Sequence, residues 1–424
     1  MSSLVIENGR LIDPARGVDE KRDLWILDGR VARAPSKPPP GILRLDARGK
    51  VVCPGLMDLH VHLREPGRSD KETIESGTRA AARGGFTSVV CMPNTSPPAD
   101  QAATVELIKA RARERGSVRV FPTGAITVGL KGEQMAEIGA LKRAGVVAIT
   151  DDGHCVQDNE VMRRAVEYAK MFNLPVLDHC QDYALSADGV ANEGYWSMVL
   201  GLRGWPAIAE EVIVSRNCLL AELADWKIHM QHLTAAGSVR ILREARKRGV
   251  KVSGEVCPHH IALTDESLRG YNTDFKMNPP LRTKADVEGL LEGIADGVIE
   301  VLASDHAPHC CYEKEVEFDF APFGIVGLET ELGIFLTELV HKKVLSLPKM
   351  IAMLTVNPAR LLGLELGTLA EGVLGDVTVL DPDLEWTVNR EEFASHGRNT
   401  PFHGRQLKGR ATATIVSGKI VWQG

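Results

Sequence analysis

Short apolar runs alternate with amphipathic or Ala/Glu/Arg-rich runs through most of this 424-residue chain. The apolar runs have the length of strands, and the segments between them, such as Lys71 to Arg83 and Ala103 to Arg115, have the length of helices. Eight alternating β and α units predict an α/β fold of the (β/α)8 TIM-barrel type, which we place at residues 55–365. The eight apolar runs end near His62, Cys91, Ala125, Asp151, His179, His232, Cys257 and Asp305.

Both ends of the chain show a different pattern, in which short strands are separated by turn dipeptides. Asn8-Gly9 and Asp28-Gly29 interrupt apolar runs near the N-terminus and predict hairpins. Near the C-terminus, the segments 375–380 and 413–422 repeat this pattern. A single strand pair is only marginally stable. We therefore expect residues 1–54 and 366–424 to pair into one small, β-sandwich-like domain.

Composition excludes some classes of partner. A formal net charge of -6 and a pI near 6.1 argue against the basic surface that nucleic-acid binding requires. No run of about 18 apolar residues is present, so we expect no membrane span. The N-terminal segment lacks the basic start and apolar core of a signal peptide, and the eight cysteines include no CxxC pair. These features predict reduced thiols and a cytoplasmic location.

Histidine and aspartate residues stand where the apolar runs end. Alternate side chains of a strand share a face, so His60 and His62 can hold one metal ion together. TIM barrels carry their active sites at the C-terminal ends of the strands. Further ligands of the types that zinc takes stand at four more such ends, namely Asp152, His179, His232 and Asp305. The sequence therefore predicts a metal-dependent hydrolase.

The number of candidate ligands favours two zinc ions over one. Two cations a few ångströms apart need an anion between them, and a carboxylate with a bridging hydroxide would serve. Asp151-Asp152-Gly153 offers the carboxylate, although this tripeptide is also common in turns. Asp305 is placed to bind one ion and to take a proton from the water, and His309 to face a substrate. We interpret His306 as structural support. His259 and His260 could also be ligands, but such a pair is more often hydrogen-bonded structure, so we leave it out of the ligand set.

Several segments of the chain resemble motifs of the dihydroorotases, within the amidohydrolase superfamily. The resemblance spans roughly residues 4–424, keeps the order of the family motifs, and is to the bacterial class with a stand-alone catalytic chain. The matching segments are Pro54 to Gly67, Met92 to Thr95, Asp151 to Gly153, His179-Cys180, Met277 to Arg282, Ser304 to His309 and Pro322 to Thr330.

The resemblance implies a role for each matching residue. His60, His62 and Asp305 would bind one zinc ion, and His179 and His232 would bind a second, with Asp152 bridging the two. Asp305 would also be the catalytic general base and acid. The residues implied to line or contact the substrate are His62, Arg64, Asn94, Asn278, His309 and the backbone of Phe323 and Gly324.

The implied reaction interconverts N-carbamoyl-L-aspartate and L-dihydroorotate in the biosynthesis of pyrimidines. A homodimer and an association with aspartate transcarbamoylase are further expectations. Two alternatives stay open: a hydantoinase- or allantoinase-like cyclic amidase, and a non-catalytic partner of aspartate transcarbamoylase. Relatives of the first kind normally bridge their metals with a carbamylated lysine, but Val118 to Ile126 and Gly145 to Asp151 contain none. Relatives of the second kind lack several ligand histidines that this chain has.

Overall fold

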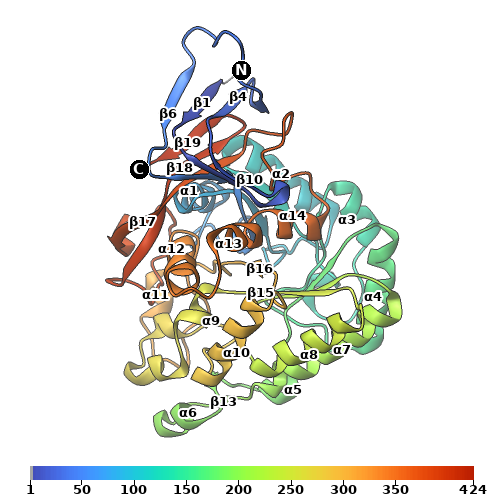
Figure 1. Cartoon of the computed structure of the whole chain (residues 1–424). Coiled ribbons are helices and arrows are strands. Elements are labelled where there is room, and N and C mark those ends of the chain that lie inside the picture. Colours follow the sequence, from blue (N-terminus) through green and yellow to red (C-terminus); the bar gives the residue numbers. More distant parts are fainter. Residues whose placement is uncertain (1–2) are drawn as a thin grey trace.

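The computed structural model describes residues 3–424, so Met1 and Ser2 of the predicted β domain lie outside the described residues. Figure 1 shows a small part rich in strands above a larger barrel, with both ends of the chain near the small part. The regular strands of the barrel pair in parallel as two groups. They are β8 (Leu56–Val61), β9 (Phe86–Cys91), β10 (Arg119–Pro122), β11 (Val176–Asp178), β14 (Ile228–Met230), β15 (Val252–Val256) and β16 (Val301–Leu302).

Two short bridged segments close these groups into a ring. Ile149 bridges in parallel to Gly124, just after β10, and to Val176 of β11. On the other side, His306 bridges to Val61 of β8. The α/β barrel is thus confirmed. The fourth run, predicted to end near Asp151, pairs through backbone hydrogen bonds with Gly124 on one side and with the start of β11 on the other. Beyond this pairing, the carboxylate of Asp151 accepts the backbone N–H groups of Ile126 and Thr127 at 2.8 and 3.0 Å.

Helices surround the barrel strands (Figure 1). Side chains of Thr73, Asp158 and Thr283 cap three of these helices by accepting backbone N–H groups of the first turn, as the chemistry of these residues favours. Shorter helices lie in the loops. The bounds are α1 Ile74–Gly84, α2 Ala102–Arg115, α3 Ile138–Ala144, α4 Asn159–Met171, α5 Tyr183–Ser186, α6 Tyr195–Leu200, α7 Ile208–Ala224, α8 Ala236–Lys247, α9 Pro258–Ala262, α10 Lys284–Ala295, α11 Cys311–Lys314, α12 Glu331–Phe335, α13 Leu347–Met353 and α14 Val356–Leu362.

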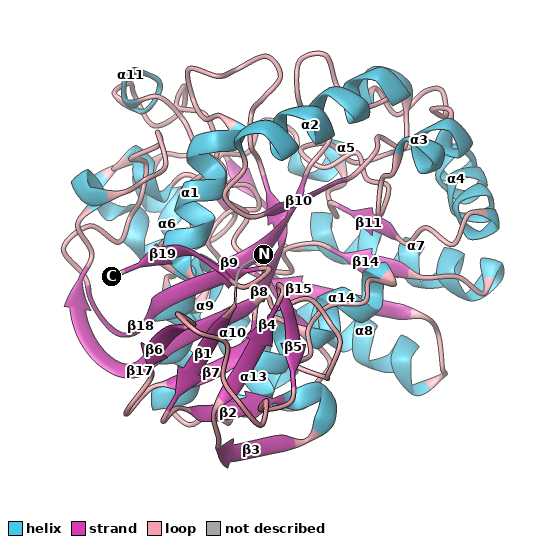
Figure 2. Cartoon of the chain, turned by 90° about the horizontal axis from the view of Figure 1, so that it is seen from above, coloured by secondary structure: helices cyan, strands magenta, loops and turns pink. Residues whose placement is uncertain are grey.

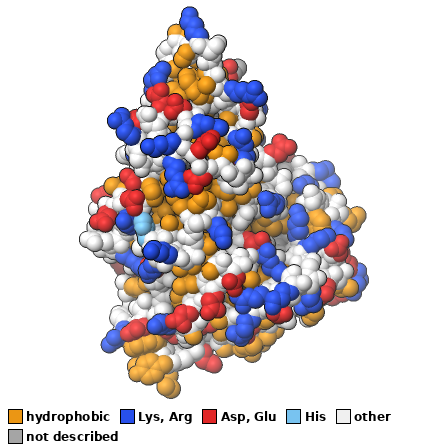
Figure 3. All heavy atoms as spheres, in the orientation of Figure 1, with side chains coloured by type: hydrophobic (Ala, Val, Ile, Leu, Met, Phe, Trp, Pro, Cys, Tyr) orange, Lys and Arg blue, Asp and Glu red, His pale blue; other side chains and the backbone are white. Residues whose placement is uncertain are grey.

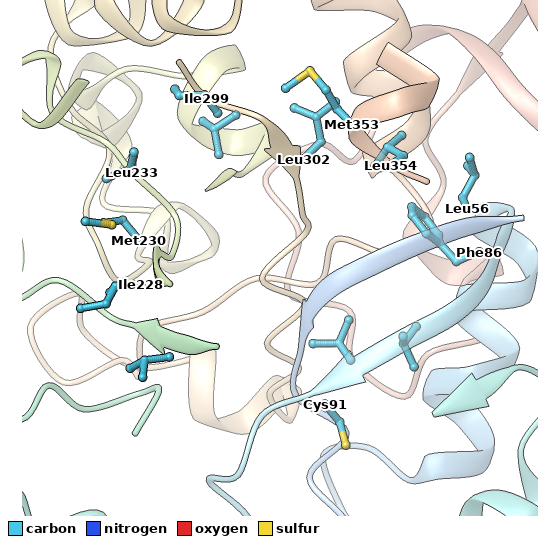
Figure 4. Close-up of a cluster of buried hydrophobic side chains, with 14 of the residues drawn as sticks. Leu56, Phe86, Cys91, Ile228, Met230, Leu233, Ile299, Leu302, Met353 and Leu354 are labelled. Carbon is cyan, nitrogen blue, oxygen red and sulfur yellow. The ribbon is translucent and has the colours of Figure 1, made fainter. Parts of the chain in front are cut away.

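Buried apolar side chains fill the space between strands and helices. Figure 4 shows part of the largest cluster, where Leu56 and Phe86 of neighbouring strands lie near Met353 and Leu354 of the α13 region. A second cluster draws on strands from around the ring, and α14 adds Leu362 to it. Its strand members include Met57, Val90, Ala148, Leu177 and Val301. This packed interior leaves the C-terminal ends of the strands for the polar cluster.

The small part consists of two sheets built from both ends of the chain. One sheet has the order β5 (Arg30–Ala32), β4 (Leu24–Leu27), β1 (Leu4–Glu7) and β6 (Leu43–Asp46). The other has the order β19 (Lys419–Gln423), β18 (Gln406–Val416), β17 (Val377–Thr387), β7 (Val51–Pro54), β2 (Arg10–Asp13) and β3 (Val18–Lys21). Figure 2 shows these strands gathered over one side of the barrel. Apolar residues from both sheets, such as Ile26 and Ile415, share one buried cluster. The β-sandwich-like arrangement is as predicted.

One of the two predicted hairpins is wrong. Asp28-Gly29 does join the antiparallel pair β4 and β5. Asn8-Gly9, in contrast, lies between β1 and β2, which belong to different sheets and do not pair with each other. A Cβ atom on Gly9 would lie 2.5 Å from a methyl of Val52, so this glycine permits a close approach where the chain crosses between sheets.

The surface carries charges of both signs. On the face drawn in Figure 3, Lys and Arg side chains are interspersed with Asp and Glu. Among residues 3–424, no helix has the length and apolar character needed to cross a bilayer. All eight cysteines are free thiols, and six of them are buried.

Candidate metal centre

All six predicted ligands meet in one buried cluster at the C-terminal ends of the barrel strands. Asp152 lies between two groups of histidines. Its Oδ2 atom is 3.1 Å from His60 Nε2 and 3.4 Å from His62 Nε2. Its Oδ1 atom is 3.6 Å from both His179 Nδ1 and His232 Nε2. The carboxylate therefore directs one oxygen to each group, which is the arrangement that a bridging ligand requires.

Asp305 completes the first group. Its Oδ1 atom lies 3.0 Å from His62 Nε2 and 3.5 Å from His60 Nε2. Asp305 and His232 have φ angles of 47° and 32°, a conformation that is uncommon for residues other than glycine. Such strain is typical of functional sites, where the surrounding structure holds a side chain in a required direction.

The candidate ligand atoms are placed to bind a cation. His60 Nε2 and Asp152 Oδ1 are buried and have no hydrogen-bond partner. A carboxylate oxygen can only accept, and leaving such groups unpaired in the interior is costly. The atoms of His60, His62 and Asp305 lie close enough to share one ion, as do those of His60, Asp152 and His232. Imidazole nitrogens with carboxylate oxygens are a ligand set that zinc accepts.

Electrostatics of the cluster also favour positive charge. Burial alone would raise the pKa of Asp152, but the neighbouring histidines, His60 first, hold it well below its usual value. Burial would lower the pKa of His60, but Asp152, Asp305 and Glu255 together raise it well above its usual value. A proton and a metal ion would therefore compete for His60 beside these carboxylates, so acid should weaken metal binding.

A cavity of about 350 Å³ opens beside the cluster. The residues implied to contact substrate all line it: His62, Arg64, Asn94, Asn278, His309, Phe323 and Gly324. Asp152, His179, His232 and Asp305 line the same cavity, so a small molecule there would touch both sets.

Arg64 and Asn278 offer this cavity unused hydrogen-bonding groups. Arg64 donates its Nε–H to the carbonyl of Pro308 at 3.3 Å and forms no ion pair with a carboxylate of the described chain. Arg64 does not pair with its neighbour Glu65, whose carboxylate lies 3.8 Å from Arg111 Nε. Asn278 Oδ1 is buried without a partner, so it can accept an N–H of a ligand.

Asn94 and His309 are already engaged in protein contacts. Asn94 Oδ1 accepts the Nδ1–H of His62 at 2.8 Å, which orients that ring, and leaves its NH2 group for a ligand. His309 donates its Nε2–H to the carbonyl of Phe323 at 2.8 Å, and its Nδ1 accepts from Lys71 at 3.1 Å. Burial, together with Arg64 and Lys71, lowers the pKa of His309 to about 3, so this ring is neutral. It would need to release Phe323 to donate to a substrate.

Two groups that support the ligands were not predicted from the sequence. Glu255 of β15 is buried with Oε1 at 2.7 Å from His60 Nδ1. Asp58, two residues before His60, accepts the backbone N–H groups of His60 and Ser304, and so ties β8 to the segment that carries Asp305. The spacing of Asp58 and His60 on one strand was the available signal for Asp58. A lone acidic residue in an apolar strand was the signal for Glu255.

The histidines outside the proposed ligand set differ in whether their ring nitrogens have partners. His306 receives a hydrogen bond from the backbone of Gly327 at 3.2 Å and lies 3.2 Å from Glu72, in agreement with a supporting role. His260 donates to the carbonyl of Pro279 at 3.0 Å, whereas neither ring nitrogen of His259 has a partner. The interpretation of the His259-His260 pair as hydrogen-bonded structure is therefore wrong for His259.

Comparisons with known proteins agree with this geometry. The model of the family described as Dihydro-orotase-like matches residues 49–238, and that of the Amidohydrolase family matches residues 220–421. A solved L-hydantoinase (dihydropyrimidinase) from Arthrobacter aurescens superposes with a TM-score of 0.89, at 26% identity, covering 100% of this chain and 96% of its own. Fold and cluster thus define the class, which is a TIM-barrel amidohydrolase of a generally metal-dependent family.

Sequence relatives narrow the class. A protein named Dihydroorotase from Pelotomaculum thermopropionicum is 54% identical over 421 residues, which covers 99% of this chain and 98% of the relative. Another of that name from Pelobacter propionicus is 49% identical, with 99% and 100% covered. The chain belongs to the dihydroorotase family.

Proposed function

We propose that this chain is a zinc-dependent dihydroorotase that interconverts N-carbamoyl-L-aspartate and L-dihydroorotate in pyrimidine biosynthesis. The observation that carries the proposal is the buried Asp152 carboxylate, which presents one oxygen to each histidine group at the edge of a cavity containing an unpaired arginine. His60, His62 and Asp305 would hold one zinc ion, and His179 and His232 a second. The lone pairs of His60 Nε2 and Asp152 Oδ1, which lack donors, support this assignment.

Zinc, when bound, would lower the pKa of a water molecule to about 7 and polarise the ring carbonyl. Asp305 would take the proton of the attacking water and deliver it to the departing ring nitrogen. A positioned acid or base contributes roughly 10²- to 10⁴-fold to such a step. Burial alone would raise the pKa of Asp305, but His60 and His62 hold it below its usual value, so its carboxylate starts unprotonated and able to act as a base.

The substrate carries a carboxylate that takes no part in bond breaking. Arg64 would bind it with two parallel N–H donors, a geometry that suits guanidinium and not the point charge of lysine. Asn278 Oδ1, unpaired in the cavity, would accept the ring N–H of dihydroorotate. The NH2 group of Asn94 would add a further donor. Together these residues would hold the substrate in the cavity that Asp305 also lines.

Turnover of dihydroorotate by the purified, zinc-loaded protein tests the proposal. The assay follows hydrolysis at alkaline pH and ring closure near pH 6, because closure consumes a carboxylate charge and takes up a proton. Hydantoin and allantoin are the comparison substrates, since a cyclic amidase of the hydantoinase kind has the same fold at 26% identity. Activity on hydantoin without activity on dihydroorotate would contradict the proposal. A homodimer, an association with aspartate transcarbamoylase and a cytoplasmic location stay predictions.

A further inference from the structure

A continuous chain of hydrogen bonds lies beneath the metal centre and reaches His60 from behind. Glu255 Oε1 is 2.7 Å from His60 Nδ1, and Glu255 Oε2 is 3.1 Å from His229 Nε2. On its other side, His229 Nδ1 lies 2.8 Å from Ser253 Oγ. His229 and Ser253 are register partners on β14 and β15, so the pairing of the two strands sets this contact.

The ends of this chain of contacts lie in different parts of the barrel. His60, Glu255 and His229 are each 0% exposed. Ser253 is partly exposed and lines a cavity of about 380 Å³, together with residues of the strand starts and of α14. The hydrogen bonds therefore cross the barrel interior from its N-terminal mouth to the metal centre.

The hydrogen-bond partners of His60 and His229 determine the tautomer of each ring. An ionised carboxylate accepts and does not donate. His60 Nδ1–H and His229 Nε2–H therefore donate to Glu255, and Glu255 Oε1 at 2.7 Å is nearer to His60 Nδ1 than Gln231 Nε2 at 3.2 Å. In a ring that carries one hydrogen the opposite nitrogen is an acceptor, so His229 Nδ1 accepts the hydroxyl hydrogen of Ser253, and His60 presents the lone pair of Nε2 when it binds a metal ion. That lone pair faces Asp152 Oδ2 at 3.1 Å, and both atoms are acceptors that a cation between them would satisfy.

We propose that Glu255 and His229 are positioning residues, which hold His60 as a metal ligand through Nε2 and place a negative charge behind it. This inference rests on the metal centre of the proposed function. Glu255 would raise the basicity of His60 and stop its ring from turning, and His229 with Ser253 would hold Glu255. Groups in such outer positions typically change metal affinity by about 10- to 100-fold.

The rings of His62 and His179 are supported differently. His62 donates to the amide oxygen of Asn94 at 2.8 Å, and His179 donates to the amide oxygen of Gln181 at 3.0 Å. Both of these acceptors are amides, whereas Glu255 offers a carboxylate. Loss of the Glu255 charge should therefore weaken the metal position at His60 more than the position at His179 and His232, where Glu255 accepts only the backbone N–H of His232 at 3.3 Å.

The test measures zinc binding by the full-length apoprotein, using competition with a chromophoric chelator that resolves two binding steps. Glu255→Gln keeps the shape of the side chain and removes its charge. Glu255→Asp keeps the charge, and His229→Gln removes the support at the far end. The matched control is Glu72→Gln, because Glu72 also pairs a buried carboxylate with a buried histidine, His306, at 3.2 Å, outside the proposed ligand set.

We expect Glu255→Gln to weaken one of the two zinc-binding steps about 10- to 100-fold. His229→Gln should lose less zinc affinity at that step, and Glu255→Asp should keep part of the affinity that Glu255→Gln loses. Glu72→Gln should change zinc affinity less than threefold. The visible spectrum of the cobalt-substituted Glu255→Gln protein should also change. Wild-type zinc affinity at both steps in Glu255→Gln would overturn the inference, while leaving the proposed function intact. Failure of the wild-type protein to bind zinc would instead overturn the metal centre itself. If Glu255→Gln does not fold, the same comparison is made with Glu255→Asp and His229→Gln.

Discussion

Replacement of Arg64 by methionine should change the stability of this protein and its substrate binding in opposite directions. Arg64 is partly buried in the cavity wall, has a φ of 57°, and gains only one hydrogen bond, from Nε to the carbonyl of Pro308. Burial lowers its pKa from 12.5 to about 10. Because one pKa unit is about 1.4 kcal/mol, keeping this charge in the substrate-free protein costs roughly 3 kcal/mol at most. Water in the open cavity reduces that cost.

Two opposite changes should follow in Arg64→Met. Removal of the charge relieves most of its burial cost and forfeits a hydrogen bond worth about 1 kcal/mol, so we expect the free energy of unfolding to rise by about 1–2 kcal/mol. Substrate binding should weaken by about 2–4 kcal/mol, because a two-pronged pair with a carboxylate is lost. That energy corresponds to a KM about 30- to 1000-fold higher. Since the bound carboxylate does not react, kcat should change only a few-fold.

Steady-state kinetics with dihydroorotate and a thermal unfolding curve on the same samples provide the assay. Arg64→Lys should give an intermediate KM, because it keeps the charge with only a single point of contact. Arg68→Met is the matched control, since the exposed Arg68 pairs with Asp70 and lies outside the cavity wall. An unchanged KM in Arg64→Met, or a marked fall in its stability, would refute the reasoning.

Three further outcomes are expected. Asp305→Asn should keep part of its zinc but lose about 10²- to 10⁴-fold in kcat, whereas near-normal turnover would exclude proton transfer by Asp305. Burial lowers the pKa of Lys314 from 10.5 to about 7, so the unfolded chain binds more protons between these values and stability should rise with pH in that window. Lys314→Met should flatten this rise. An equal free energy of unfolding of the wild-type protein at pH 7 and pH 9, measured by chemical denaturation, would contradict the assignment. Zinc should leave the protein more readily at pH 5 than at pH 7.5 in chelator titrations, because protons compete for His60.

The sequence predicted the barrel well because its signal is local and repeated. Helix α2 begins at Ala102, one residue from the predicted start, and ends at Arg115 as expected. The fourth run lies in the ring as predicted, but local sequence does not reveal that the side chain of Asp151 at its end accepts the backbone N–H groups of Ile126 and Thr127. The Asn8-Gly9 hairpin failed for a similar reason. Glycine there serves a contact with Val52, which is remote in sequence and belongs to another strand.

Ligand-type residues were predictable because a TIM barrel brings the C-terminal ends of all its strands together. The groups behind them were not. Glu255 stands alone in an apolar strand, which indicates that it needs a buried partner, but its partners His60 and His229 follow only from the register of neighbouring strands. Likewise, nothing in the local sequence shows that the donor of His309 is taken by the carbonyl of Phe323.

Anomalous diffraction at the zinc edge, from crystals of the zinc-loaded protein, tests the central assignment most directly. Two peaks are predicted, one on each side of the Asp152 carboxylate, with the first in contact with His60, His62 and Asp305 and the second in contact with His179 and His232. The absence of any peak at Asp152 in a zinc-loaded crystal, or zinc bound only at a different group of residues, would contradict it.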